Sequence, residues 1–314
     1  MKRIFQLTIG FLLFSLPLLS QEVSKETHLY AIKGQDSLFL DKYELKNEET
    51  NKPALIYVFG GGFVGGSRDS QVDYFRFLAK NGLTVFAIDY RLGLKNLKKA
   101  ETLDPAKFAA LLEHTISIAV EDLLSATGYI IHNAKEWNID PAKVIVCGSS
   151  AGAITALQAE YQLCSNSLIA GLFPAQFNYA GVIAFAGAIF SRESQLECNR
   201  RPAPILLFHG DADSNVPYDK ITIEGLGGMY GSKYIAEQLS AADCPYHFYS
   251  VKNAGHEIAN APMTDNRNEI LSFINNLVFN KEQQIINTTV EQIGKSDMKK
   301  DITLEDMIKS NYGQ

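Results

Sequence analysis

The chain has 314 residues, of which 46% are hydrophobic and 20% charged, and its formal net charge at pH 7 is -6. This is the composition of a globular protein, and the length suits one large domain that buries a core without a disulfide or metal staple. The acidic balance excludes a broad basic surface of the kind that binds nucleic acid.

The first 20 residues have the pattern of a secretory signal peptide. Lys2 and Arg3 precede an apolar run over residues 4–19, and a polar stretch begins at Ser20. The run falls short of the ~20 residues that a membrane-spanning helix needs, so an uncleaved anchor is the weaker alternative. We expect cleavage near Ser20, export to the periplasm or the medium, and no stable membrane insertion afterwards.

Residues 21–280 alternate between short apolar runs and helical patterns. Two strands, His28–Lys33 and Leu38–Leu45, are expected to form a hairpin around Gly34. Six further strands are expected in apolar runs: Leu55–Phe59, Thr84–Ile88, Val144–Cys147, Val182–Ala186, Ile205–Phe208 and His247–Val251. Helices are expected at Asp73–Asn81, Phe108–Trp137, Ala151–Leu163, Ser232–Ala241 and Asn266–Val278. This order predicts an α/β fold, with a mostly parallel central sheet, an antiparallel N-terminal hairpin and helices on both faces.

Three segments break this rhythm. The irregular stretches Ser165–Tyr179 and Ile189–Pro204 could act as a lid over a site or be plain surface loops. Residues 281–314 are polar with weak helical periodicity, and we expect a tail of one or two short peripheral helices, or partial disorder.

Export bears on the four cysteines, because oxidising compartments allow disulfides. Cys147 lies in an apolar strand pattern and is expected to be a buried free thiol. A bridge between Cys164 and Cys198 is possible, but Cys244 is an equally available partner, and spacing does not choose between them. No cysteine or histidine cluster in the sequence suggests a metal site.

The pentapeptide Gly148-Ser149-Ser150-Ala151-Gly152 fits the G-x-S-x-G nucleophile elbow. An expected strand runs into it and an expected helix leaves it, which favours the elbow over a plain Gly/Ser turn. The helix N-terminus favours developing negative charge at Ser150. We therefore expect Ser150 to be a nucleophile.

A serine nucleophile needs a general base, and the base needs an orienting acid. The loop after the Ile205 strand contains Asp213, our choice for the acid, and Asp211, its competitor. His256 follows the last expected strand and completes the order Ser, Asp, His. The triad is therefore expected to be Ser150, Asp213 and His256.

The triple glycine in Phe59-Gly60-Gly61-Gly62-Phe63 follows another expected strand. The N–H groups of Gly61 and Gly62, together with that of Ala151, are expected to form an oxyanion hole. The spacing does not match a phosphate-binding glycine loop, and no Lys-Ser/Thr pair follows it.

With these motifs the chain resembles the α/β-hydrolase superfamily, in its carboxylesterase/lipase-like group, which includes hormone-sensitive-lipase-like and feruloyl-esterase-like enzymes. The resemblance covers residues 28–280 and is carried by the triple glycine, Asp89-Tyr90-Arg91-Leu92, Ile139-Asp140-Pro141, the elbow, Asp213 with Val216-Pro217, and Gly255-His256. It implies an α/β-hydrolase fold and hydrolysis of small-molecule or carbohydrate esters through an acyl-enzyme, without metal or organic cofactor. The chain departs from the family pattern at three places: Phe59 replaces a His, Ser149 an acid, and Ala153 a glycine.

Two other functions fit the same scaffold. Serine peptidases share this triad order, although they typically carry a large extra domain for which this chain has no room. Inactive binding proteins also use the fold, but they usually lose a triad member.

Overall fold

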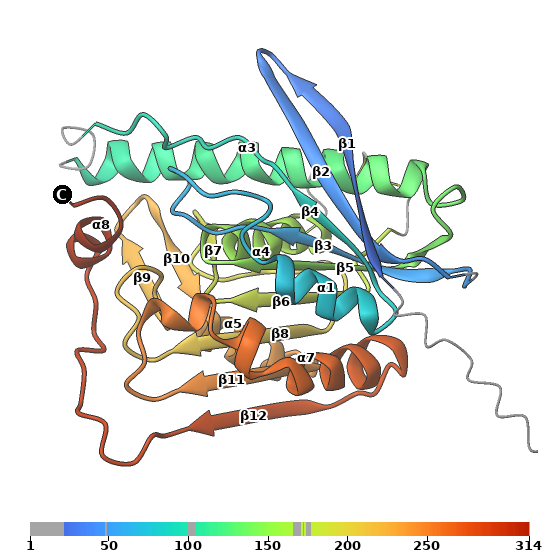
Figure 1. Ribbon diagram of the computed structural model, residues 1–314. Helices are drawn as coiled ribbons and strands as arrows, with labels where there is room; N and C mark the ends of the chain where they lie inside the picture. Colours follow the sequence, from blue (N-terminus) through green and yellow to red (C-terminus); the bar gives the residue numbers. More distant parts are fainter. Residues whose placement is uncertain are drawn as a thin grey trace, which may run out of the picture.

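The computed structural model describes residues 22–47, 49–98, 104–165, 171, 173 and 177–313. The expected signal peptide at residues 1–20 and most of the candidate lid Ser165–Tyr179 lie outside these residues. The described strands and helices build a layered α/β domain around a large central sheet (Figure 1).

The described part of the central sheet has nine strands in the order β1-β2-β4-β3-β5-β6-β8-β11-β12. Their bounds are β1 Val23–Lys33, β2 Asp36–Leu45, β3 Lys52–Val58, β4 Thr84–Ile88, β5 Ile139–Ser149, β6 Gly181–Phe185, β8 Ile205–Gly210, β11 Tyr246–Val251 and β12 Ile285–Val290. Strand β2 pairs antiparallel with β1 and β4, and the strands from β4 to β12 run parallel. The expected α/β-hydrolase fold with its N-terminal hairpin is confirmed.

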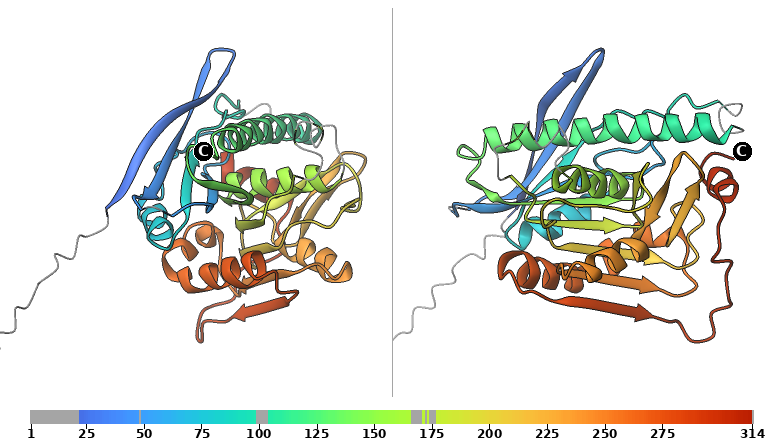
Figure 2. Two further views of the ribbon diagram at one scale, coloured as in Figure 1. Left: turned by 90° about the vertical axis from the view of Figure 1, so that its right-hand side faces the viewer. Right: turned by 180° about the vertical axis from the view of Figure 1, so that it is seen from behind.

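Helices cover both faces of this sheet, as predicted. α3 (Pro105–His132) and α4 (Ala151–Cys164) lie on one face, and α1 (Val72–Lys80) and α7 (Arg267–Phe273) lie on the other (Figure 2). α5 (Ser232–Ala241) packs on β8 and β11. The remaining described helices are η2 His256–Ala259, α6 Pro262–Asp265, η3 Ile274–Phe279 and α8 Leu304–Tyr312.

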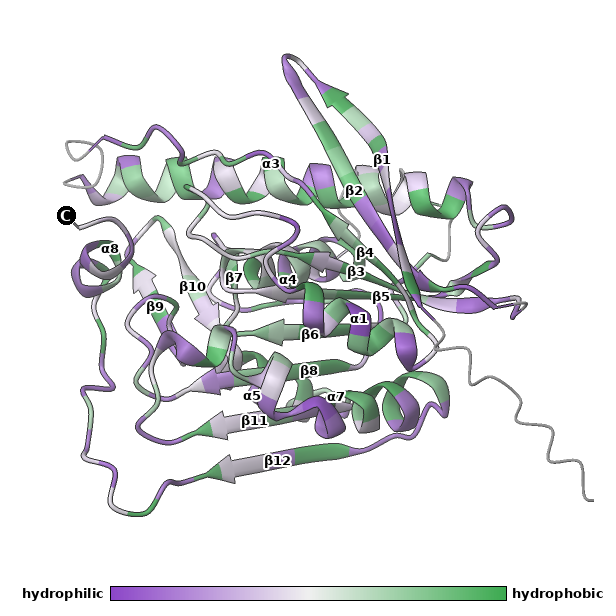
Figure 3. Cartoon of the chain, viewed as in Figure 1, coloured by the Kyte–Doolittle hydropathy of each residue, from purple (hydrophilic) through white to green (hydrophobic). Residues whose placement is uncertain are grey.

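Most residues of the inner strands are buried, as a sheet covered on both faces requires. Every residue of β4, β6 and β8 is buried, and β6 and β8 are hydrophobic along most of their length in Figure 3. The core therefore lies between the sheet and its two helical layers, and the carboxyl ends of the parallel strands are left to carry a site.

Two regions differ from the sequence expectations. A second sheet is formed by β7 (Ala188–Ser191), β10 (Gly227–Gly231) and β9 (Lys220–Ile223), so the stretch expected to be irregular from Ile189 begins as a strand. Residues 281–314 are expected to hold short helices or to be partly disordered; they do hold the helix α8, but Ile285–Val290 form β12, an edge strand parallel to β11. β-Branched residues make up most of it, and only one side of an edge strand needs a partner.

The cysteine pairing left open by the sequence is Cys164–Cys198 in the structure. Cys147 and Cys244 are buried free thiols, as expected for Cys147. The bridge ties the C-terminal end of α4 to the loop after β7. Among the described residues, no helix is long and apolar enough to cross a membrane.

Candidate active site

Ser150 occupies a sharp turn between β5 and α4. Its backbone angles, φ 52° and ψ -119°, lie in a region that side chains other than glycine rarely enter. The flanking glycines are sterically required: a Cβ at Gly148 would lie 2.2 Å from the Gly152 carbonyl oxygen, and one at Gly152 would lie 2.0 Å from the Val58 carbonyl oxygen. The sequence therefore has the strand–turn–helix geometry that a nucleophile elbow needs.

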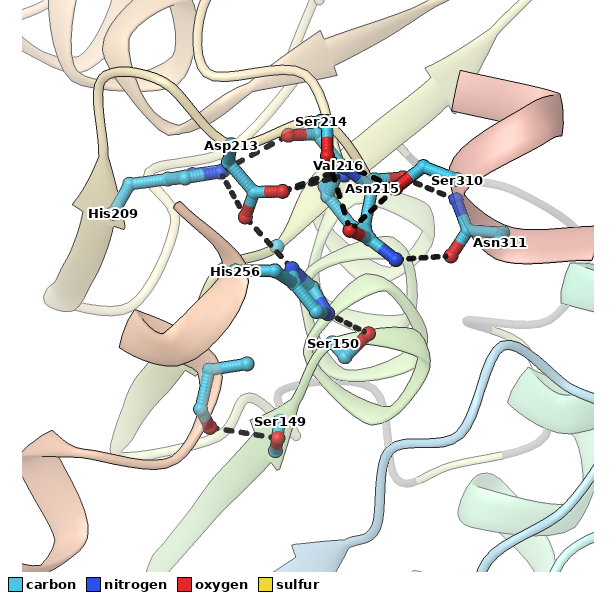
Figure 4. Close-up of polar contacts among 12 residues, drawn as sticks. Ser149, Ser150, His209, Asp213, Ser214, Asn215, Val216, His256, Ser310 and Asn311 are labelled. Atoms are coloured by element: carbon cyan, nitrogen blue, oxygen red, sulfur yellow. Dashed lines mark hydrogen bonds and ion pairs between the residues drawn. The ribbon is translucent and has the colours of Figure 1, made fainter. Parts of the chain in front are cut away.

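The structure brings together the three residues expected to form a triad (Figure 4). His256 Nε2 lies 2.8 Å from Ser150 Oγ, and His256 Nδ1 lies 2.7 Å from Asp213 Oδ2. The three side chains follow β5, β8 and β11, at the carboxyl ends of parallel strands. With Nδ1–H donating to the carboxylate, Nε2 is free to accept the hydroxyl proton of Ser150.

Asp213, and not its competitor Asp211, faces the histidine. Asp211 accepts a hydrogen bond from the backbone N–H of Asn253 at 2.6 Å and pairs with Lys300 at 3.0 Å. Its carboxylate is therefore held by the loop that carries the histidine and by the C-terminal tail. The choice of acid made from the sequence agrees with this geometry.

The Asp213 carboxylate is 1% exposed and surrounded by hydrogen-bond donors. The backbone N–H groups of Asn215 and Val216 donate to Oδ1 at 2.8 and 3.1 Å. Burial opposes ionisation of this carboxyl group, but the hydrogen bonds from His209 and His256 outweigh it and hold the pKa of Asp213 well below its usual range. Asp213 thus stays ionised in the folded protein.

His209 is a residue that sequence reasoning passed over. It is fully buried at the end of β8, with Nε2 3.4 Å from Asp213 Oδ2 and Nδ1 2.8 Å from Ser232 Oγ. The sequence could have indicated a role for His209, because this histidine follows an apolar strand pattern and lies four residues before the acid. Polar side chains in such strands need partners, and here Nε2 lies 3.2 Å from the Val216 carbonyl oxygen as well as beside the orienting acid.

The glycine loop lies directly against the nucleophile. A Cβ at Gly60 would stand 2.9 Å from the Ser149 carbonyl oxygen and 3.1 Å from Ser150 Cβ, so a side chain there would force the loop away from the elbow. Gly62 and Ala151 line the same small cavity as Ser150. Gly61, which precedes Gly62 in the sequence, does not line this cavity. Tyr90 Oη donates to the Phe59 carbonyl oxygen at 2.9 Å and Tyr312 Oη to that of Gly62 at 3.2 Å, so two tyrosines hold the loop in place.

Ser149 stands where the family usually has an acid. Its hydroxyl donates to the Ala259 carbonyl oxygen at 2.7 Å, in the short helix η2 that begins with His256. This hydrogen bond ties the elbow to the segment that carries the histidine. In the described part of the chain, no group of three or more His, Cys, Asp or Glu side chains is arranged to hold a metal ion.

Comparisons with known proteins add to this geometry. The family model described as BD-FAE matches residues 40–188, which contain the glycine loop and the elbow. Fumonisin B1 esterase of Sphingopyxis macrogoltabida is 31% identical over 38% of this chain and 22% of its own length. An acetyl esterase of Salmonella choleraesuis (strain SC-B67) is 26% identical over 46% of this chain and 40% of its own length. The matches thus span less than half the length of these curated relatives.

Among solved structures, the native form of the Thermogutta terrifontis esterase Est2 is similar, with a TM-score of 0.58 and 20% identity. The match covers 80% of this chain and 92% of the esterase. At this identity the likeness shows the fold. The fold is thus that of the α/β hydrolases, and within it part of the chain is similar to the BD-FAE family model and to parts of two esterases.

Proposed function

We propose that the protein hydrolyses carboxylic esters, with Ser150 as nucleophile, His256 as general base and Asp213 as the orienting acid. The observation that carries this proposal is the hydrogen-bonded series from Ser150 Oγ through His256 to Asp213, with links of 2.8 and 2.7 Å. The esterase names among the relatives point to the same class of reaction.

In the proposed reaction, His256 Nε2 takes the proton of Ser150 as Oγ attacks the ester carbonyl carbon. The resulting imidazolium is stabilised by the ionised Asp213. The tetrahedral intermediate collapses when His256 returns the proton to the departing alcohol, and an acyl-enzyme remains. Water, activated by the same histidine, then releases the acid and restores Ser150.

The oxyanion formed during attack needs N–H donors that are already in position. The N–H of Ala151, at the first turn of α4, and those of Gly61 and Gly62 are assigned this role. The placement of Gly62 and Ala151 beside Ser150 supports the assignment. Each such donor contributes about 10²–10³ in rate.

The site of action is proposed to lie outside the cytoplasm, in the periplasm or the medium, with a small-molecule or carbohydrate ester as substrate. The signal-like pattern of residues 1–20 supports export. The Cys164–Cys198 disulfide is also typical of oxidising compartments.

The test uses purified mature protein, a fluorophosphonate probe and 4-nitrophenyl acetate. Wild-type protein is expected to be labelled and to hydrolyse the ester, and Ser150→Ala to lose both properties. Ser117→Ala, an exposed serine on α3, is the control that should keep both. Labelling of Ser150→Ala at the wild-type level would refute the assignment of the nucleophile.

The same assay separates the other two functions. An aminoacyl 4-nitroanilide, run in parallel, should be hydrolysed far more slowly than the ester; the reverse order would indicate a peptidase. A wild-type protein that is folded but neither labelled nor active would instead indicate a binding protein.

A further inference from the structure

The C-terminal helix α8 returns to the active site from the far edge of the sheet. β12 ends at Val290, and residues 291–303 run along the outside of the domain before α8 begins at Leu304 (Figure 1). Nearly all of this connecting segment is exposed. Because the connecting segment is exposed, the contacts of α8 itself are needed to fix its position at the carboxyl ends of the strands.

One set of contacts joins α8 to the loop that carries the acid (Figure 4). Ser310 Oγ lies 2.9 Å from Ser214 Oγ and donates to Asn215 Oδ1 at 3.0 Å. Asn311 Nδ2 donates to the Asn215 carbonyl oxygen at 2.7 Å, and Asn215 Nδ2 donates back to Asn311 Oδ1 at 3.1 Å. Ser214 and Asn215, the partners of α8 in this loop, directly follow Asp213 in the sequence.

A second set of contacts joins α8 to the glycine loop and the core. Tyr312 Oη donates to the Gly62 carbonyl oxygen, and the Tyr312 ring meets Phe108 of α3 edge-on at 5.8 Å between centroids. Met307 is 4% exposed and belongs to the hydrophobic core. α8 thus bridges the acid loop on one side of Ser150 and the glycine loop on the other.

The space left in front of the nucleophile is small. A cavity of about 20 Å³ adjoins Ser150, and α8 supplies one side of it through Met307, Asn311 and Tyr312. The remaining lining is mostly apolar and comes from Gly62, Phe63, Leu112, Ala151, Ile154, Asn215, Val216, Pro217 and Met229. This volume is close to that of one water molecule or one methyl group, and the cavity is open to solvent on one side.

The position of the cavity decides which half of an ester it receives. The departing oxygen must lie beside His256, which returns the proton to it. His256 is not among the described residues that line the cavity, whereas Gly62 and Ala151 on the oxyanion side are. The cavity therefore lies on the oxyanion side of Ser150, a position that suits the acyl group better than the departing alcohol.

We propose that α8 is the wall of the acyl pocket and that Met307 restricts the substrates to acetyl esters and other very short acyl esters. This inference rests on the proposed ester hydrolysis and adds the acyl class to it. Tyr312 acts differently, as a positioning residue that holds the glycine loop through the Gly62 carbonyl.

The first experiment measures kcat/KM of wild-type protein for 4-nitrophenyl acetate, butyrate and hexanoate. Each methylene that a pocket must reject is worth at least about 10-fold, so acetate should exceed butyrate by about 10²-fold or more. Equal rates for acetate and hexanoate would overturn the assignment of α8 as a restrictive wall. They would leave the proposed function intact, provided that Ser150→Ala abolishes both rates.

The second experiment shortens the wall. Met307→Ala should raise the butyrate-to-acetate ratio of kcat/KM by about 10-fold or more, because it opens space where the acyl chain must extend. Met307→Val, which removes less volume, should raise it by a smaller factor and is the variant to use if Met307→Ala does not fold. Glu305→Ala, on the exposed side of the same helix, is the matched control and should leave the ratio unchanged.

Tyr312→Phe separates positioning from packing. It keeps the ring and removes only the hydrogen bond to Gly62, so kcat for acetate should fall while the butyrate-to-acetate ratio stays at the wild-type value. A folded Met307→Ala or Met307→Val variant with an unchanged ratio would overturn the inference even if Ser150-dependent hydrolysis persists. Failure of every ester, together with failure of the fluorophosphonate label, would instead overturn the proposed function on which it rests.

Discussion

Asp211 and Asp213 are two residues apart on one loop and have different environments. Asp213 points inward, where its oxygens accept hydrogen bonds from two backbone N–H groups and approach His256 and His209. Asp211 is directed toward Asn253 and Lys300. The sequence favoured Asp213 but left Asp211 as a competitor, because the decision depends on where the histidine loop, some 40 residues later, meets the two carboxylates.

This difference predicts different kinetic effects for two isosteric changes. Asp213→Asn should lower kcat for 4-nitrophenyl acetate by about 10³–10⁴-fold, because the amide neither fixes the His256 tautomer nor stabilises its charge. Asp211→Asn should change kcat by no more than a few-fold, because Asp211 does not contact His256. Steady-state rates at saturating ester provide the measurement, and a larger loss for Asp211→Asn than for Asp213→Asn would refute the assignment of the acid.

The sequence predicted best those helices and strands whose apolar residues form a clear pattern and are buried in the fold. The buried strand at Thr84–Ile88 and the helix after Ser150 agree with the structure at nearly every residue. The small sheet was missed because its strands are four or five residues long and β10 contains three glycines. Apolar periodicity needs longer segments to emerge.

The C-terminal region shows the same limit in the candidate site. The weak periodicity around Met307 indicated a helix, and α8 is one. Its place over Ser150 could not be read from the sequence, because its contacts are with residues about 95 and 250 positions earlier in the chain. The motifs around Ser150, Asp213, His256 and the triple glycine each lie within a few consecutive residues, so these residues could be named from the sequence. The contacts of α8 with the active site join segments far apart in the chain, so they could not.

Helix α4 carries a buried carboxylate that the proposed reaction does not use. Glu160 is 1% exposed, and its Oε1 accepts a hydrogen bond from the Ala203 N–H at 2.8 Å. Burial raises the pKa of Glu160 to about 7, against lowering effects of the Ala203 N–H, the Arg200 charge and the Asn178 side chain. The folded state therefore binds this proton more strongly than the unfolded state, in which a glutamate has a pKa of about 4.3.

The raised pKa of Glu160 should make the stability of the folded protein fall as pH rises. Between about pH 4.3 and 7 the folded state holds more protons than the unfolded state, so the Glu160 contribution to stability falls as pH rises and its full cost applies above pH 7. Glu160→Gln keeps an oxygen for Ala203 and removes the titration. Its Tm should exceed that of wild type by several degrees at pH 8.5, and by much less at pH 5.

Thermal melts followed by circular dichroism at the two pH values test this expectation. Glu136→Gln, an exposed glutamate, is the control and should follow wild type at both. A Tm difference between Glu160→Gln and wild type that is the same at pH 5 and pH 8.5 would show that Glu160 does not titrate in this range.

The proposed active site and the disulfide bridge lie at opposite ends of helix α4. The triad and the acyl pocket lie at the carboxyl ends of the parallel strands, whereas the Cys164–Cys198 bridge joins the other end of α4 to the loop after β7. The bridge closes a loop with a sequence separation of 34 residues. None of the hydrogen bonds of Ser150, His256 or Asp213 involves either cysteine.

Stability and activity should therefore separate when the bridge is removed. For a loop of this length the chain-entropy model gives a stabilisation of about 4 kcal/mol, which for a domain of this size corresponds to a Tm change of roughly 10 °C. The double variant Cys164→Ser/Cys198→Ser should melt lower by about this amount and retain kcat for 4-nitrophenyl acetate at 25 °C within a few-fold. Dithiothreitol should lower the Tm of wild type toward that of the variant and leave the variant unchanged. If the variant matched wild type in Tm, the bridge would contribute nothing to stability; if it folded but lost kcat, the end of α4 would have to influence Ser150 along the length of the helix.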